Sequence, residues 1–427
     1  MKEEEIGVEI APIDEEQEPF ADGSVQGWLT VLGSTLVYFA SFGFTNSFGF
    51  FQDYYQTHYL PGYPPSTIAF IGTLQTTLMY VIGPVAGALF DAYGLGWIYP
   101  TAALGCCCSV VGLSFSQPGA LWQPFVSQGV LFGLVVAFNT QPALAVVGQH
   151  FKQRRALAMG LVSGGSSISS SFLPIVLSYL VPKIGFGWSL RVVALMMLCC
   201  YLIAMAISRT KEQPKPMKAK AVVSNLLDFH GYKDPRYLVL SIGNFVATLG
   251  LYIPYYYIGS YALLRHPLAS IHQYLLPLIN GSGFFGRVLG GYIADKTGRL
   301  NLLCPMTLLS GVFCLAMWLP DRSGSIGTVL TFVCLYGVTS GVFISVTPPA
   351  VAQISPDDKV GARIGAFFIP TAVATLLGSP IAGMLVDESS QDGYTNMILF
   401  AGITLIAGGC LMCVGRILCD RDLKKKW

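Results

Sequence analysis

Long apolar blocks, separated by short polar stretches, dominate this chain. Twelve such blocks lie at 28–51, 67–90, 98–115, 123–147, 156–181, 188–208, 237–263, 271–294, 300–319, 326–351, 361–386 and 396–419. Each is close to the roughly 20 residues that an α-helix needs to cross the hydrocarbon core of a membrane. The pattern therefore predicts an all-α membrane protein with twelve transmembrane helices.

Composition excludes a soluble protein. Of the 427 residues, 53% are hydrophobic and 11% are charged, and the mean hydropathy is +0.58. An ordinary soluble domain carries about 25% charged residues. The polar side chains are too few to cover a water-facing surface, and no basic stripe that would bind nucleic acid is present.

Lysine and arginine are distributed unevenly over this twelve-span arrangement. Only Lys183, Arg191, Arg265 and Arg322 fall in outer loops, whereas twenty of the 25 basic residues fall in loops or tails on the other side. Because basic loops remain cytosolic, both termini are expected in the cytosol. We expect the plasma membrane, with the vacuolar or another internal membrane as the alternative.

Two pairs of similar segments recur at a nearly constant spacing. GALFDAYG from Gly87 matches GYIADKTG from Gly291, and RRALAMG from Arg154 matches KVGARIG from Lys359, at offsets of 204 and 205 residues. This spacing predicts a duplicated six-helix unit. The expected parts are a disordered acidic cytosolic tail (1–25), a first bundle (26–208), a cytosolic linker (209–236), a second bundle (237–419) and a short basic cytosolic tail (420–427).

The turn that starts at Gly291 has the pattern G-x-x-x-D-K-x-G-R, with Asp295, Lys296 and Arg299 at its charged positions. It resembles the cytosolic loop signature of the major facilitator superfamily, which implies the major facilitator fold. A carboxylate at such a position can pair with cations or with a helix N-terminus. The expected inner-gate residues are Asp91, Arg154, Arg155, Asp295, Lys296 and Arg299.

Two further stretches resemble the signatures of the monocarboxylate transporter family. They are DGSVQGW at 22–28, which has one residue more than the family pattern, and HFKQRRALAMGLVSGG at 150–165. TNSFGFFQ at 45–52 and GLYIPYYYIGSYA at 250–262 are similar to the fungal members. The resemblance implies alternating-access transport of a small organic anion, a monocarboxylate or a related metabolite.

Arg287 is the only formal charge well inside a predicted span. A charge there is costly unless it faces a cavity or a partner. The resembled family places an arginine at this point of the eighth helix, facing the substrate carboxylate; pairing with Asp295 or a backbone carbonyl is the structural alternative. The acid and the lysine that the animal members use for proton coupling are replaced by Gly283 and Asn46, so lactate-type proton symport is not implied.

Several uncharged side chains within the blocks are weaker candidates for substrate contact. Pro254 is expected to break the seventh helix and turn neighbouring tyrosines inward, which would suit a substrate larger and flatter than lactate. For each candidate, hydrogen bonding between helices is an equal alternative. With Arg287, the expected substrate-binding residues are Asn46, Asn139, Gln141, Tyr255, Tyr256 and Asn280.

No catalytic or cofactor-binding constellation accompanies these features. The five histidines are dispersed, and the CxxC pair Cys410 and Cys413 lies in the last apolar block without a nearby histidine. We expect no enzymatic activity, no cofactor and no bound metal. We expect a monomer in the lipid bilayer whose transport is driven by a gradient, and whether a proton is the coupling ion stays open. An exporter of a secondary metabolite or drug-like compound is the alternative, and a non-transporting nutrient receptor is a weaker one.

Overall fold

The computed structural model describes residues 23–151, 153–211, 227–265, 271–320, 325–356, 359–387, 393–422 and 425–426. Most of the predicted acidic tail and of the predicted linker lies outside these residues. Within them the chain forms helices, joined by turns and short loops, and contains no strand. The helical prediction is confirmed.

Each predicted apolar block is helical, with ends within a few residues of those expected. The long elements are α4 (Pro65–Tyr93), α5 (Leu95–Leu113), α7 (Gly133–His150), α8 (Arg155–Ile207), α12 (His272–Thr297), α13 (Arg299–Phe313), α14 (Ile326–Gln353), α15 (Val360–Met384) and α16 (Thr395–Cys419). The fourth span begins earlier, with α6 (Trp122–Pro124) and the π-helix η2 (Phe125–Phe132), and the ninth ends with the π-helix η4 (Cys314–Trp318). α8 contains the fifth and sixth blocks, which turn at Gly185, where φ is +80°. Glycine adopts this backbone conformation without a steric penalty.

Two spans are interrupted. The first consists of α1 (Val25–Ala40), α2 (Phe42–Asn46) and α3 (Phe48–Tyr54), followed by the π-helix η1 (Tyr55–Tyr59). At its two breaks, the hydroxyls of Ser41 and Ser47 donate to carbonyls one turn earlier, which bends a helix. The seventh span consists of α10 (Pro235–Leu251) and α11 (Ile253–Arg265), and it breaks beside Pro254, as the sequence predicts.

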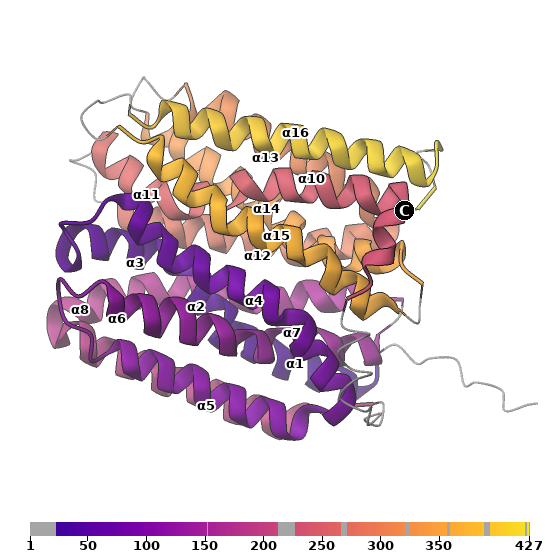
Figure 1. The fold of residues 1–427 in the computed structure, drawn as a ribbon, viewed down its shortest axis with the longest axis horizontal. Helices are drawn as coiled ribbons and strands as arrows, with labels where there is room; N and C mark the ends of the chain where they lie inside the picture. Colours follow the sequence, from indigo (N-terminus) through magenta and orange to yellow (C-terminus); the bar gives the residue numbers. More distant parts are fainter. Residues whose placement is uncertain are drawn as a thin grey trace, which may run out of the picture.

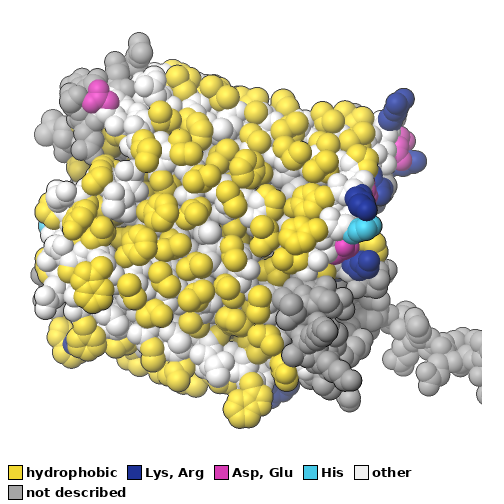
Figure 2. Space-filling view, in the orientation of Figure 1, with side chains coloured by type: hydrophobic (Ala, Val, Ile, Leu, Met, Phe, Trp, Pro, Cys, Tyr) yellow, Lys and Arg dark blue, Asp and Glu magenta, His cyan; other side chains and the backbone are white. Residues whose placement is uncertain are grey.

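The helices run roughly side by side in two groups. α1 to α8 form one half and α10 to α16 the other, and the halves meet where α8 packs against α12 and α4 against α15 (Figure 1). Apolar side chains cover most of the face seen in Figure 2, whereas the lysines and arginines gather at one end. We call this the inner end, and the opposite one the outer end.

Nine helices in the described part are long and apolar enough to span a membrane. One of them, α8, contains two blocks. The interrupted first span and α12, which carries Arg287, Asp295 and Lys296, complete the predicted set. Large lipid-facing side chains such as Leu195 (62% exposed) and Ile403 (56% exposed) fit a hydrocarbon environment.

Candidate functional site

A cavity of about 820 Å³ lies between the two halves. Its walls come from α1, α2, α4, α7 and α8 of the first half and α10, α14 and α15 of the second. Asp91, Arg155, Arg299 and Gln353 lie around its mouth, at the inner end of the molecule. The volume falls within the range of about 300–1,000 Å³ that holds a drug-sized ligand.

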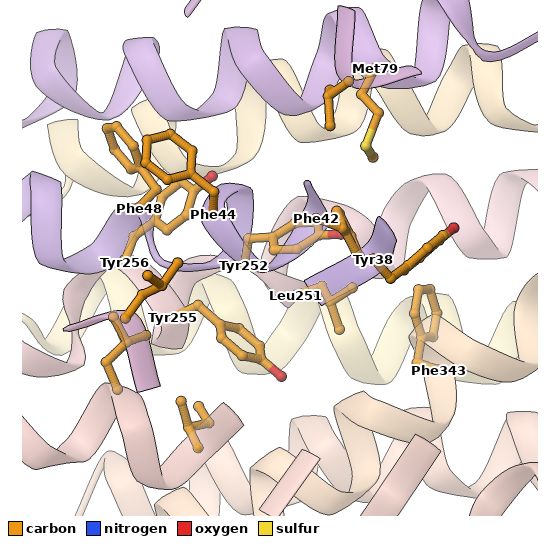
Figure 3. Packing of buried hydrophobic residues seen from close by; sticks show 14 of the residues in the cluster. Tyr38, Phe42, Phe44, Phe48, Met79, Leu251, Tyr252, Tyr255, Tyr256 and Phe343 are labelled. Atoms are coloured by element: carbon orange, nitrogen blue, oxygen red, sulfur yellow. The ribbon is translucent and has the colours of Figure 1, made fainter. Parts of the chain in front are cut away.

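Aromatic side chains form much of the deep wall. Tyr38, Phe42, Tyr252 and Phe343 line it and project between the helices in Figure 3. Tyr80 stacks on Phe368 across the halves, with ring centroids 5.1 Å apart, and its hydroxyl lies 3.2 Å from that of Tyr252. These rings offer flat apolar faces that carry hydroxyl groups at their edges.

The polar groups of the deep cavity are uncharged. Gln141 of α7, a predicted candidate, lines it together with Thr140. On the opposite wall Asn244 donates to Thr371 Oγ1 at 2.7 Å, and its own Oδ1 has no partner among the described residues. The charged lining residues of the described part are those at the mouth. The deep cavity can therefore accept and donate hydrogen bonds without presenting a charge to the substrate.

Arg287 lies beside this cavity rather than on its surface. It is 1% exposed, and its Nη1 donates to the Ser163 carbonyl of α8 at 2.8 Å and to the Ser166 hydroxyl. Ser163 itself lines the cavity. In this conformation the guanidinium thus joins α12 to α8 through a backbone carbonyl, which is one of the alternatives left open above. Asp295 pairs with Arg299 instead.

The other neutral candidates are buried around this region and lie off the cavity surface. Asn139 donates to Cys106 Sγ at 3.4 Å, inside the first half. Asn280 donates to the Leu276 carbonyl of its own helix. Each of these two amides keeps an oxygen, and Asn46 keeps its nitrogen, without a partner among the described residues.

The two tyrosine candidates help to close the outer end. The ring of Tyr256 packs on Phe48 of the first half, with centroids 5.3 Å apart, whereas the hydroxyl of Tyr255 lies 2.9 Å from Ser340 Oγ of α14, within the second half. Gly49 lies so close to α11 that a Cβ there would be 2.5 Å from the Tyr255 carbonyl oxygen. The structure is therefore closed at its outer end and open at its inner end.

At the inner end, the turn in the second half is docked on the first half. Asp295 accepts hydrogen bonds from the backbone N–H groups of Ala156 (3.3 Å) and Leu157 (3.0 Å), at the start of α8. Arg299 Nη2 lies 3.6 Å from Asp295 Oδ1. A carboxylate is stabilised at a helix N-terminus because the free N–H groups and the helix dipole favour negative charge.

The remaining gate candidates lie near the mouth. Gly87, Asp91 and Arg155 line it, and Arg154 immediately precedes α8. Lys296 Nζ lies 4.3 Å above the ring of Tyr292.

Sequence reasoning missed most of the aromatic wall. Tyr38, Tyr80 and Tyr252 lie in apolar blocks, where a cavity-facing tyrosine and a lipid-facing one give the same pattern. Only contact between the halves separates the two cases. Asp53, at the outer end of α3, was also missed because it follows the first predicted block.

Comparison with known proteins gives a consistent result. The family model of the Major Facilitator Superfamily matches residues 30–320 and 274–422. MFS transporter asaE of Aspergillus flavus is 35% identical over 95% of this chain and 90% of its own length. Aspyridones efflux protein apdF of Emericella nidulans is 34% identical (93% and 79%), and agnestins efflux protein AgnL12 of Paecilomyces divaricatus is 33% identical (93% and 89%).

Solved structures share the fold at low sequence identity. The nucleoside transporter NupG superposes with a TM-score of 0.67 at 13% identity, over 92% of this chain and all of its own. The human organic anion transporter MFSD10 gives 0.64 at 15% identity, over 92% and 98%.

Proposed function

The chain belongs to the Major Facilitator Superfamily and is a multi-pass membrane transporter, and we propose that it exports a flat, partly aromatic metabolite. The observation that carries this proposal is the large inner-facing cavity with aromatic walls and uncharged polar groups. Lactate, with few atoms and a formal charge, would leave most of this wall without contact. The names of two relatives, efflux proteins for aspyridones and agnestins, support the same direction of transport.

Within the superfamily we propose a place close to the monocarboxylate transporters. The support is the stretch HFKQRRALAMG at 150–160 together with Arg287 on α12. The guanidinium is bonded to Ser163, which lines the cavity, so release of this bond would leave its donors free for a carboxylate or an acidic hydroxyl. Arg287 is therefore proposed as an anion contact that a larger aromatic substrate reaches late in the cycle.

The remaining assignments are proposals as well. Both termini are proposed to lie in the cytosol, because lysines and arginines gather at one end of the molecule and basic loops remain cytosolic. The plasma membrane is proposed as the location. The chain is proposed to act as a monomer, without catalysis, on a small-molecule substrate in the bilayer. The inner-gate residues named above are proposed to control the mouth.

The test is a transport assay with purified protein in lipid vesicles. Three labelled compounds are compared in the same vesicles: a flat phenolic acid, its neutral methyl ester and lactate, each corrected for leak through protein-free vesicles. We expect protein-dependent movement of the phenolic compounds and little of lactate. Transport of lactate alone would contradict the aromatic proposal, and movement of no solute would favour a receptor.

Matched variants of Tyr252 localise the effect. Tyr252→Phe keeps the ring, and Tyr252→Ala removes it. We expect Tyr252→Ala to lower the rate for the phenolic compounds by about tenfold or more, equivalent to about 1.4 kcal/mol, and Tyr252→Phe to lower it much less. Equal rates in the two variants would show that the Tyr252 ring does not contact the substrate.

A further inference from the structure

Asp53 is an acidic side chain at the outer contact between the halves. It lies in the last turn of α3, partly buried, and faces α11 of the other half. The Ser260 hydroxyl donates to Asp53 Oδ1 at 2.6 Å. The neighbouring Gly259 also lies against Asp53: a Cβ at position 259 would clash with the Asp53 carboxylate. The outer end closes here with a carboxylate held between two helices.

Within the described residues this carboxylate has no cationic partner, since no lysine, arginine or histidine nitrogen lies within 4.0 Å of it. His58 of η1 is exposed, stacks on Tyr54 and lies 2.6 Å from the Thr57 hydroxyl. The other titratable groups of the adjoining elements lie on α11, η1 and α4. Those of α11 and η1 are Tyr55, Tyr59, Tyr255, Tyr256, Tyr257, Tyr261 and Arg265, and those of α4 are Tyr80, Asp91 and Tyr93, toward its inner end.

The serine hydroxyl cannot satisfy both acceptors near it. Ser260 has one hydrogen, and Gln56 Oε1 lies 3.4 Å from the same oxygen. A partly buried carboxylate with a single neutral donor is poorly stabilised as an ion. Binding a proton removes the charge and adds an O–H group that can donate to a neighbouring oxygen. Closing the outer end around Asp53 therefore favours its protonated form.

We propose that Asp53 is a proton-binding site that holds the outer gate closed. A proton from the outer solution binds a carboxylate oxygen as α3 and α11 come together, and it leaves to that solution when they separate. Asp53 does not line the inner cavity, so in this conformation the cavity gives its proton no route to the inner solution. The consequence is that an acidic outer solution favours the inward-facing state. This inference rests on the proposed alternating-access function, but not on the identity of the substrate.

The test measures how far the inner mouth is open as the pH changes. Gly87→Cys places a thiol at the mouth, where no atom lies within 4 Å. A water-soluble maleimide is applied to the purified full chain in nanodiscs, and alkylation of position 87 is quantified by peptide mass spectrometry, so the native cysteines do not interfere. The same chain with Asp53→Asn is the control at each pH, because titration of the new thiol is common to both.

We expect the alkylation rate, relative to Asp53→Asn, to be highest at acidic pH and to fall by up to about tenfold per pH unit as the carboxyl ionises. Ser260→Ala removes the hydrogen bond that stabilises the ion, so the fall should move to higher pH. Asp53→Glu should retain a pH-dependent fall. Parallel pH profiles in the parent and in Asp53→Asn would overturn the proposal.

A second measurement separates gating from proton transport. It does not use Asp53→Asn, so it still tests the proposal if that variant folds poorly. Vesicles that contain the parent or Asp53→Glu and enclose the pH dye pyranine receive the phenolic acid used above. Proton movement that is stoichiometric with the solute, and that Asp53→Glu changes, would make Asp53 a coupling group and overturn the gating proposal. If the phenolic acid is not transported but the alkylation rate still depends on pH as expected, only the proposed substrate class is contradicted and the gating proposal stands.

Discussion

The fifth helix of each half begins at the inner end, but the two beginnings are held differently. The start of α8 receives Asp295 from the opposite half, through the N–H groups of Ala156 and Leu157. The start of α15 is held by the segment that precedes α10: Asp228 Oδ2 lies 3.2 Å from Arg363 Nε. One helix start therefore joins the halves, whereas the other is tied to the end of the linker.

The two related glycine turns differ in the same way. A Cβ at Gly291 would lie 2.5 Å from the Ala156 carbonyl oxygen, whereas a Cβ at Gly87 would have no atom within 4 Å. Farther from the inner end, α4 and α15 are still joined, because Thr77 donates to the Ala372 carbonyl at 3.2 Å. Nearer the inner end, a Cβ at Gly365 would lie 2.8 Å from Pro84 Cγ, so α4 and α15 stay in contact up to Pro84. Similar sequences thus form a tight contact between α12 and α8 at Gly291 and leave open space at Gly87. The duplication specifies the helices, and the conformational state decides which contact is made.

The largest effect is expected from a side chain forced into the closed contact. Gly291→Val places methyl groups against the α8 backbone, which cannot move as a flexible side chain could. Overpacking of this kind costs about 1–3 kcal/mol. We expect a clearly lower melting temperature and loss of transport for Gly291→Val. The matched change Gly87→Val should leave the melting temperature within a degree or two, on the order of 0.5 kcal/mol; equal losses would contradict the difference between the turns.

A second prediction separates the structural and the transport roles of Arg287. Arg287→Met keeps much of the volume and removes a buried charge, which is often neutral or stabilising for the fold. We expect an unchanged or higher melting temperature, together with at least about tenfold slower transport of the phenolic acid, equivalent to about 1.4 kcal/mol. Its neutral ester should be affected less.

Arg287→Lys and Arg287→Ala complete this series. Lysine keeps a charge without the planar fork of donors, and alanine removes both. Transport of the acid by both variants at the parental rate would contradict a role of Arg287 in anion contact.

The bond between Asp295 and the start of α8 provides the third prediction. Asp295→Ala leaves two helix N–H groups without their acceptor and removes the carboxylate partner of Arg299, which keeps its bond to the Pro349 carbonyl. We expect a loss of about 1–3 kcal/mol in unfolding free energy, measured by thermal unfolding in nanodiscs. Asp295→Asn retains one acceptor and should lie between the parent and Asp295→Ala. An asparagine variant less stable than the alanine variant would argue against the helix N-terminus as the partner.

The smallest effect is expected at the start of α15. Partial burial on its own raises the pKa of Asp228, but the Arg363 guanidinium and the His230 backbone N–H outweigh it, so this pKa lies below the ordinary value. The ionised pair therefore adds stability above the unfolded-state pKa, and this contribution is lost as pH falls through the folded-state pKa.

Arg363→Ala tests this pair. At neutral pH the variant should lose about 0.5–1 kcal/mol, and its melting temperature should fall less on acidification than that of the parent. Thermal unfolding over a series of acidic pH values measures both effects. Identical pH profiles in parent and variant would contradict the pair.

Much of the fold could be predicted from the sequence, but only part of the site. The twelve spans follow from block length and the two halves from the offset repeats, because both patterns are local or periodic. For Asp295 the sequence leaves a choice between cations and a helix N-terminus, and the structure shows both partners. Tyr80 and Tyr252 could not be identified as cavity residues, because a tyrosine buried between the halves gives the same apolar sequence pattern as one that faces lipid. The breaks at Ser41 and Ser47 could not be predicted because they depend on the geometry of the serine hydroxyls.

The most direct test compares distances across the two inner contacts. Spin labels on encoded non-cysteine residues are placed at Gly87 and Gly361, across the cavity mouth just beyond the contact of Pro84 with Gly365, and in a second protein at Gln153 and Tyr292, beside the contact of α8 with α12. Pulsed electron paramagnetic resonance in nanodiscs should give a longer and broader distribution for the first pair than for the second. A second pair as long and broad as the first would contradict an inward-facing carrier in which α8 and α12 stay joined.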